Sequence, residues 1–368
     1  MEFDQSHYSL TNNNNDNKGK LAILMAINGA CLFVGSVSST LLSKFYFIHN
    51  GSSRWVSTLV QSAGFPLLLP FIFLPPYLFP STHHRKPFAC FSRKLLILSI
   101  LAGFLIGVDN FLFSWGTSYL PVSTSSLLLS SQLAFNLLLS VIIVKQNITF
   151  HNLNCVVLLT LASVLLAMGS TNDRVLGLTR PDYFVGFFCT IGAGLLFALY
   201  LPLMEMIYRK VDCFAMVVEM QMVMEASATA LIVVGMTVAN RYEDLGTKES
   251  EIFDMGPKAY WWTVVGTTVT WQLSFMGTAG VVFLTTSLTG GVCMTALMAV
   301  NVLGGVVVYG DKFSSLKAIS TILCGWGFCS YVYGIYSETK YVDVDDEDMS
   351  LKTNHDHHRL RMAEKDGV

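Results

Sequence analysis

Long stretches of this 368-residue chain contain no lysine or arginine and few charges of either sign. Charged residues make up 13% of the sequence and hydrophobic residues 52%, with a mean hydropathy of +0.52. A soluble domain carries about 25% charged residues, so this chain lacks the charge that covers a water-soluble surface. Its net charge is −2 and no basic patch interrupts the apolar stretches. Nothing in it is typical of nucleic-acid binding.

Histidine and cysteine are placed where they predict neither a metal site nor a disulfide framework. All eight histidines fall in expected loops, tails or span edges, so we expect no metal site inside the apolar segments. No cysteine falls in an expected outward loop, so we expect no structural disulfide. The polar first 20 residues lack the basic-then-apolar order of a cleaved signal, and their run of asparagines predicts a disordered tail.

Ten apolar runs, separated by charged residues or by proline and glycine, predict an all-α membrane protein. Each membrane helix needs about 20 apolar residues. The runs are residues 21–43, 55–79, 94–115, 122–144, 150–168, 183–207, 214–238, 258–281, 284–309 and 315–337. We expect a disordered N-terminal tail (1–20), a first five-helix repeat (21–168), a second five-helix repeat (183–337) and a cytoplasmic C-terminal tail (338–368).

The lysines and arginines between these runs predict the orientation in the membrane. Most of them fall on the side that also holds both tails. Because cytoplasmic segments carry an excess of lysine and arginine, we expect both termini in the cytosol. The oligomeric state has no sequence signal, and the lipid bilayer is the one large partner that the composition implies.

The two halves of the chain resemble each other. A shift of 161 residues lays Gly116-Thr117 on Gly277-Thr278, and lays residues 124–127 on residues 285–288. Five spans per half is an odd number, so the second copy enters the membrane from the opposite side. Such an inverted repeat places a binding site near the membrane midplane between the halves and permits alternating access.

Amides and aromatic side chains near the middle of the spans are candidates for binding a small molecule. Gln132 and Asn136 stand four residues apart and share one helix face, and each amide offers donors and acceptors. Bonds between helices, or plain core packing for the mid-span tryptophans, are the structural alternatives. The candidate set is Asn110, Trp115, Gln132, Asn136, Gln221, Trp271, Gln272 and Asn301.

Carboxylates inside the spans are candidates for proton coupling. An ionisable group in a membrane is costly and is usually kept for function, and burial favours the protonated form of an acid. Glu225 is the deepest acid and the favoured candidate, Asp109 is second because it adjoins Asn110, and Glu219 lies nearer the cytoplasm. Pairing with Arg209 and Lys210 is the structural alternative for Glu219.

The spans contain acidic residues but no lysine or arginine near their middle, which favours a neutral or weakly basic cargo. A carrier of phosphate esters needs lysine or arginine in its cavity, whereas Lys44, Lys145, Lys258 and Lys317 stand near span ends. An intramembrane enzyme is the alternative of a different class. We find no deep His/Asp pair or metal cluster for it, so we expect a carrier that is not an enzyme and holds no cofactor.

Several segments resemble the plant purine permeases, a branch of the drug/metabolite transporter superfamily. They are Asp109 to Phe113, Tyr119 to Asn136, Leu201 to Tyr208, Glu219-Met220-Gln221, Thr270-Trp271-Gln272, Tyr309 to Lys312, Trp326-Gly327-Phe328 and Ser330-Tyr331. The resemblance covers about residues 20–337. It implies ten helices in two inverted halves, uptake driven by a proton gradient, and plasma-membrane residence. The implied cargoes are adenine, cytokinins and related heterocycles; alkaloids, vitamin B6-type compounds and uncoupled facilitation remain alternatives.

Overall fold

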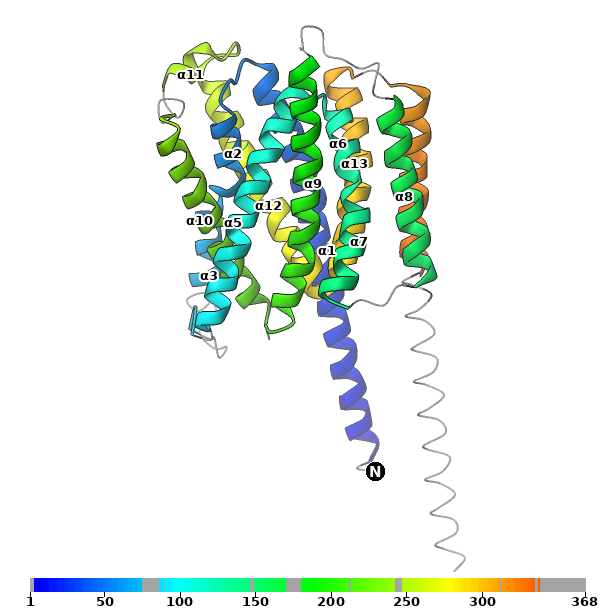
Figure 1. Ribbon diagram of the computed structural model, residues 1–368. Coiled ribbons are helices and arrows are strands. Elements are labelled where there is room, and N and C mark those ends of the chain that lie inside the picture. Colours follow the sequence, from blue (N-terminus) through cyan, green and yellow to red (C-terminus); the bar gives the residue numbers. More distant parts are fainter. Residues whose placement is uncertain are drawn as a thin grey trace, which may run out of the picture.

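The computed structural model describes residues 3–74, 86–89, 91–145, 149–169, 180–211, 213–241, 247–311, 313–334 and 337. Every regular element in these ranges is a helix, and the helices form one upright bundle (Figure 1). The expected C-terminal tail lies outside the described residues. The expected N-terminal tail overlaps the start of α1, and the division of the chain into tails and repeats stays a prediction.

Where the structure describes them, the expected spans consist mainly of helical residues. The first half holds α1 (Phe3–Ile48), α2 (Arg54–Ser62), η1 (Phe65–Leu68), α3 (Leu69–Phe73), α5 (Arg93–Tyr119), α6 (Val122–Ser130), α7 (Gln132–Ile143) and α8 (Phe150–Gly169). The second half holds α9 (Arg180–Tyr208), α10 (Phe214–Val238), α11 (Thr247–Ile252), α12 (Pro257–Leu284), α13 (Ser287–Tyr309) and the helical residues 315–334.

Two of the expected spans are divided. The second splits into α2, η1 and α3 after Gly64, where Pro66 and Pro70 cannot donate a backbone hydrogen bond. The fourth splits into α6 and α7 at Ser131, whose hydroxyl donates to the carbonyl oxygen of Leu128 at 2.6 Å. Such a local bond competes with the helical ladder. Both breaks lie at the depth of the central cavity described below.

Six helical segments of the described chain are long and apolar enough to cross a membrane. They are Leu21–Ile48, Arg54–Phe73, Arg93–Tyr119, Pro181–Tyr208, Phe214–Val238 and Ser287–Tyr309. The layout of ten crossings in two repeats therefore remains a prediction, although the all-helical class is confirmed among the described residues.

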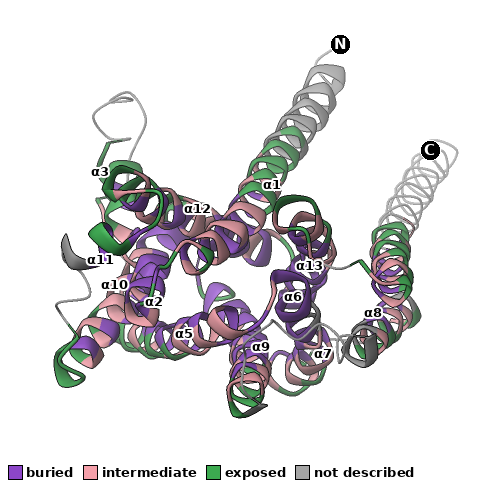
Figure 2. Cartoon of the chain, turned by 90° about the horizontal axis from the view of Figure 1, so that it is seen from above, coloured by how far each residue is buried: buried purple, intermediate pink, exposed green. Residues whose placement is uncertain are grey.

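The bundle has an apolar outside and a polar inside. On α5, exposed Ile97, Leu101, Phe104 and Val108 follow one another at helical spacing, while Asp109 and Asn110 are buried. Figure 2 shows the same pattern around the ring of helices, with buried residues on their inner sides. An exposed apolar surface of this extent is typical of contact with lipid.

Close helix pairs frame the interior. α1 packs against α12, and α5 against α9. At the first crossing, a Cβ on Gly35 would lie 2.3 Å from the backbone nitrogen of Ser274, and one on Gly277 equally close to that of Leu32. Glycine is required at both positions, since small residues permit such an approach between membrane helices.

Candidate functional site

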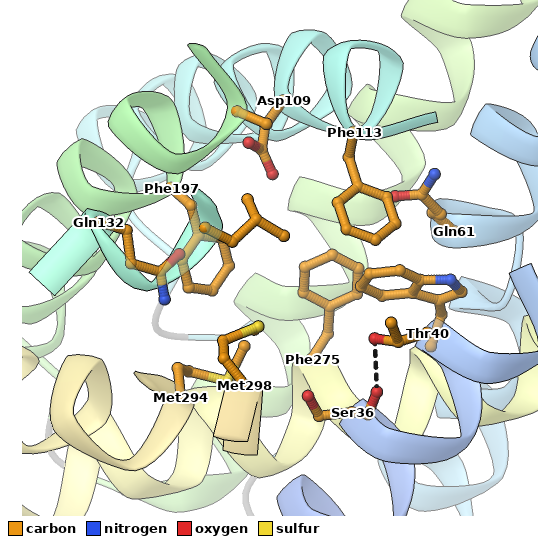
Figure 3. Close-up of a pocket in the computed structure, with 13 residues that line it drawn as sticks. Ser36, Thr40, Gln61, Asp109, Phe113, Gln132, Phe197, Phe275, Met294 and Met298 are labelled. Atoms are coloured by element: carbon orange, nitrogen blue, oxygen red, sulfur yellow. Dashed lines mark hydrogen bonds between the residues drawn. The ribbon is translucent and has the colours of Figure 1, made fainter. Parts of the chain in front are cut away.

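A central cavity lies between the two halves of the bundle. Its empty space, counting the parts open to the outside, is about 460 Å³, and the centre of a water-sized sphere can reach about 40 Å³ of it, so the cavity is narrower than a typical small-molecule site. It is lined by Ser36, Thr40, Gln61, Asp109, Phe113, Leu129, Gln132, Ala193, Phe197, Trp271, Phe275, Met294 and Met298 (Figure 3). These residues come from α1, α2, α5, α6, α7, α9, α12 and α13.

Aromatic rings form the flat walls of this cavity. The Phe113 and Trp271 ring centroids lie 5.3 Å apart at an interplanar angle of 84°, and those of Trp271 and Phe275 lie 5.6 Å apart at 31°. Trp271 donates from Nε1 to the Ser43 hydroxyl at 3.2 Å, which fixes the indole. Figure 3 shows Phe197 beside Gln132, across from Phe113. Such walls suit a flat ring.

Gln61 presents a fixed acceptor to the cavity. Its Nε2 donates to the carbonyl oxygens of Ser57 at 3.0 Å and Asn110 at 3.2 Å, and to the Ser114 hydroxyl at 2.7 Å. With the amide nitrogen committed to these acceptors, Oε1 has no hydrogen-bond partner among the described residues. A buried polar atom without a partner is costly, and a ligand that donates a hydrogen bond would satisfy it.

Asp109 and Gln132 add two more polar atoms without partners. Asp109 is 7% exposed and Gln132 is 2% exposed. Asp109 Oδ1 and Gln132 Nε2 are buried and lack a hydrogen-bond partner in the described structure. In Figure 3 both side chains extend toward the space between the aromatic rings. The cavity therefore offers one amide donor, one amide acceptor and a carboxyl group. The carboxyl group can donate a hydrogen bond when protonated and only accepts when ionised.

Glu225 belongs to a second polar cluster and does not line the cavity. Its Oε1 accepts hydrogen bonds from Gln221 Nε2 at 2.9 Å and from Gln272 Nε2 at 3.2 Å, while Oε2 has no partner in the part of the chain that the structure describes. This cluster joins α10 to α12 beside the break in the second span, where a Cβ on Gly64 would lie 2.8 Å from Gln272 Oε1. Three of the predicted side chains thus meet one another rather than the cavity.

The remaining predicted residues lie around the cavity without lining it. Asn136 donates to the Ser287 carbonyl oxygen at 3.1 Å, and Asn301 donates to the hydroxyl of the cavity residue Thr40 at 3.4 Å. The Arg54 guanidinium lies 4.7 Å from the Trp115 ring. Asn110 contributes its backbone oxygen to Gln61. Glu219 is buried on α10.

The sequence therefore predicted Asp109, Gln132 and Trp271 as binding or coupling residues, but not most of the other residues that line the central cavity. Gln61 carried a usable signal, because it is the one amide in its expected span and that span contains no acid. Phe113, Phe197 and Phe275 carried none, since the chain has 25 phenylalanines and nothing in the pattern separates these three.

The chain resembles known membrane transporters over most of its length. A family model for purine nucleobase transmembrane transport matches residues 23–341. Probable purine permease 4 of Arabidopsis thaliana is 56% identical over 312 residues, which cover 84% of this chain and 81% of that protein. Purine permease 3 of the same plant is 34% identical over 321 residues, covering 84% and 90% respectively.

A protein of known crystal structure has a similar fold. The alignment covers 84% of this chain and 98% of the other protein's chain, with a TM-score of 0.54 and 14% sequence identity. The matches to the permeases confirm the family that the motifs predicted, and with it an integral membrane transporter. The chain belongs to the purine permease family of nucleobase transporters.

Proposed function

We propose that this protein imports adenine and related nitrogen heterocycles, including cytokinins, by proton-coupled alternating access. The observation that carries the proposal is the central cavity, where aromatic walls from Phe113, Trp271 and Phe275 meet the unpartnered polar atoms of Gln61, Asp109 and Gln132. The family supports nucleobase transport as the activity.

The polar atoms of the cavity are of the kinds that bind the hydrogen-bonding groups of a purine. Adenine carries ring nitrogens that accept hydrogen bonds and an exocyclic amine that donates them. Gln132 Nε2 is a free donor for a ring nitrogen, and Gln61 Oε1 is a free acceptor for an N–H group. None of the described lining residues is a lysine or an arginine, which favours an uncharged or weakly basic cargo over a phosphate ester.

Asp109 is the carboxylate best placed to couple proton entry to cargo. It lines the cavity with an unpartnered oxygen, whereas Glu225 is held by two glutamines outside the lining. A protonated Asp109 donates to a ring nitrogen of the cargo, and an ionised Asp109 loses that bond. Cargo and proton then bind together and leave together, with the proton gradient as the driving force and no cofactor.

We place the protein in the plasma membrane with both termini in the cytosol. The distribution of lysine and arginine supports this orientation. The side of the bundle at which α9 ends and α13 begins is then cytoplasmic, and the side at which α5 ends and α6 begins is outward (Figure 1). Import requires the cavity to open first to the outward side.

Radiolabelled adenine uptake into proteoliposomes, with and without an inward proton gradient, tests the proposal. We expect gradient-driven accumulation that excess cytokinin suppresses. Uptake that ignores the gradient would leave a facilitator. If folded protein takes up no adenine, the nucleobase proposal fails, and alkaloids and vitamin B6-type compounds become the next cargoes to test.

The same uptake assay shows whether Asp109 or Glu225 couples proton entry to cargo uptake. Asp109→Asn should lose accumulation against a gradient while keeping adenine exchange across the membrane, and Glu225→Gln should keep accumulation. The reverse result would move the coupling to the Glu225 cluster.

A further inference from the structure

We propose that two opposed latches close the two ends of the cavity: Lys44 with Asp311 at one end, and Glu205 with Arg209 at the other. The proposal rests on transport by alternating access and adds the residues that hold each end shut. Each latch clasps the short junction between two consecutive helices, α5–α6 at the first end and α12–α13 at the second.

At the α12–α13 junction the clasping group is Glu205, 4% exposed near the end of α9. Its Oε2 accepts a hydrogen bond from the Ser287 backbone nitrogen at 2.6 Å. Its Oε1 accepts from Arg209 Nη2 at 2.7 Å, and Arg209 Nη1 donates to the Val144 carbonyl oxygen at 3.2 Å. One ion pair thereby ties α9 to the start of α13 and to the end of α7.

At the α5–α6 junction the clasping groups are Lys44 and Asp311. Lys44 Nζ donates to the carbonyl oxygens of Thr117 at 3.0 Å and Leu120 at 2.8 Å, which end α5. Asp311 Oδ2 accepts from the Ser123 backbone nitrogen at 3.0 Å, which begins α6. Buried Lys317 donates to the Ser123 hydroxyl at 2.9 Å, and Asp311 attracts Lys44 electrostatically.

Each charged side chain binds backbone groups whose partial charge is opposite to its own. The first backbone N–H groups of a helix lack partners inside the helix and carry partial positive charge. Glu205 and Asp311 each give a carboxylate to one such start. α6 depends on Asp311 in particular, because its N-cap residue, Pro121, makes no side-chain capping bond. Lys44 in turn meets carbonyl oxygens at a helix end, which carry partial negative charge.

The two latches occupy equivalent places in the repeat. The shift of 161 residues that lays Gly116 on Gly277 also lays Lys44 on Glu205. Each of these residues stands near the end of the first helix of its half and clasps the junction between the third and fourth spans of that half. The equivalent residues have opposite charges, so the two ends close by different contacts and can be released separately by mutation.

Both latches act on helices that line the cavity. α13 and the α6–α7 pair run antiparallel and in contact (Figure 1). Leu129 follows the first residue of α6 by seven positions, and Met294 follows the first residue of α13 by seven, which is about 10 Å along each helix. Releasing one helix start therefore opens a path to the cavity from that end.

Side-specific labelling tests the latches without any cargo. A cysteine at the cavity position of Met298 (Met298→Cys) is exposed to a membrane-impermeant maleimide from either face of reconstituted vesicles. Mass spectrometry reads the modification at that residue alone, so the native cysteines stay. Variants Asp311→Asn and Lys44→Met release one end, Glu205→Gln and Arg209→Gln release the other, and Asp254→Asn removes a surface carboxylate paired with His49 as the control.

We expect each release to raise labelling from its own end about tenfold, the change expected for the loss of a hydrogen bond to a charged group, and to lower labelling from the opposite end. The control should label like the parent. Two variants per end, each checked by its melting temperature, keep the test open if one fails to fold. Equal labelling from both ends, or rates unchanged from the parent, would overturn the latches. Either outcome is independent of the cargo, so it leaves nucleobase uptake to its own assay.

Discussion

The side-chain amide of Asn136 donates a hydrogen bond to the carbonyl oxygen of Ser287 at 3.1 Å. Gln132, one turn earlier on α7, instead lines the central cavity with an unpartnered Nε2. Two amides that share a helix face therefore have different surroundings, one at the contact with α13 and the other at the cavity.

This difference predicts different kinetic effects. Gln132→Ala should raise the apparent KM for adenine about fivefold, since one hydrogen bond is worth on the order of 1 kcal/mol, with the melting temperature unchanged. Asn136→Ala should lower the melting temperature and the maximal rate and leave KM near that of the parent. Uptake kinetics and thermal melting of both variants check this. A raised KM in Asn136→Ala alone would reverse the assignment.

Gln61 should act as a cargo acceptor. Gln61→Ala removes Oε1 from the cavity and should raise the KM for adenine about fivefold to tenfold. The matched control is Ser114→Ala, which removes one acceptor of the Gln61 amine and leaves Oε1 in place. If the two variants have the same KM, Gln61 serves only to hold α2 against α5.

Trp271 should stack on the cargo, and Trp262 on the same helix supplies the control. Trp271 lines the cavity, whereas Trp262 is 77% exposed on the outside of the bundle. Trp271→Ala should weaken adenine binding by roughly 1–3 kcal/mol, the range for stacking of a base on an aromatic side chain, and Trp271→Phe should restore part of the loss. Trp262→Ala should bind adenine like the parent. Equal losses at both positions would argue for a general effect on folding.

The apolar runs predicted the helices well because burial in lipid is a property of whole segments. The expected run 214–238 coincides with α10. The breaks at Gly64 and Ser131 were not predicted, because they depend on local hydrogen bonding in the folded protein. The Ser131 hydroxyl bonds to the carbonyl oxygen of Leu128, and Pro66 has no N–H group to donate. For the site, helical periodicity shows which residues share a face but not which neighbour that face meets. Gln221 and Gln272 were therefore expected to line the cavity, although both donate to Glu225.

Glu249 should stabilise the fold from outside the cavity. This buried carboxylate on α11 accepts hydrogen bonds from the Ser52 and Ser53 backbone nitrogens at 2.8 Å and from the hydroxyls of Tyr46 and Tyr260. Glu249→Ala leaves these donors unsatisfied and should cost on the order of 3 kcal/mol, seen as a lower melting temperature. Glu251→Ala, an exposed neighbour on the same helix, should melt like the parent. A Glu249→Ala protein as stable as Glu251→Ala would contradict the role given to this carboxylate.

Photolabelling with radiolabelled 2-azidoadenine, followed by mass-spectrometric mapping of the modified residue, tests most directly whether the central cavity is the cargo site. The label should attach to lining residues such as Phe197, Met294 or Met298, and excess adenine should prevent it. Attachment that adenine prevents but that maps to the apolar groove of Phe33, Cys293 and Phe328, or to the Glu225 cluster, would contradict the assignment of the cavity.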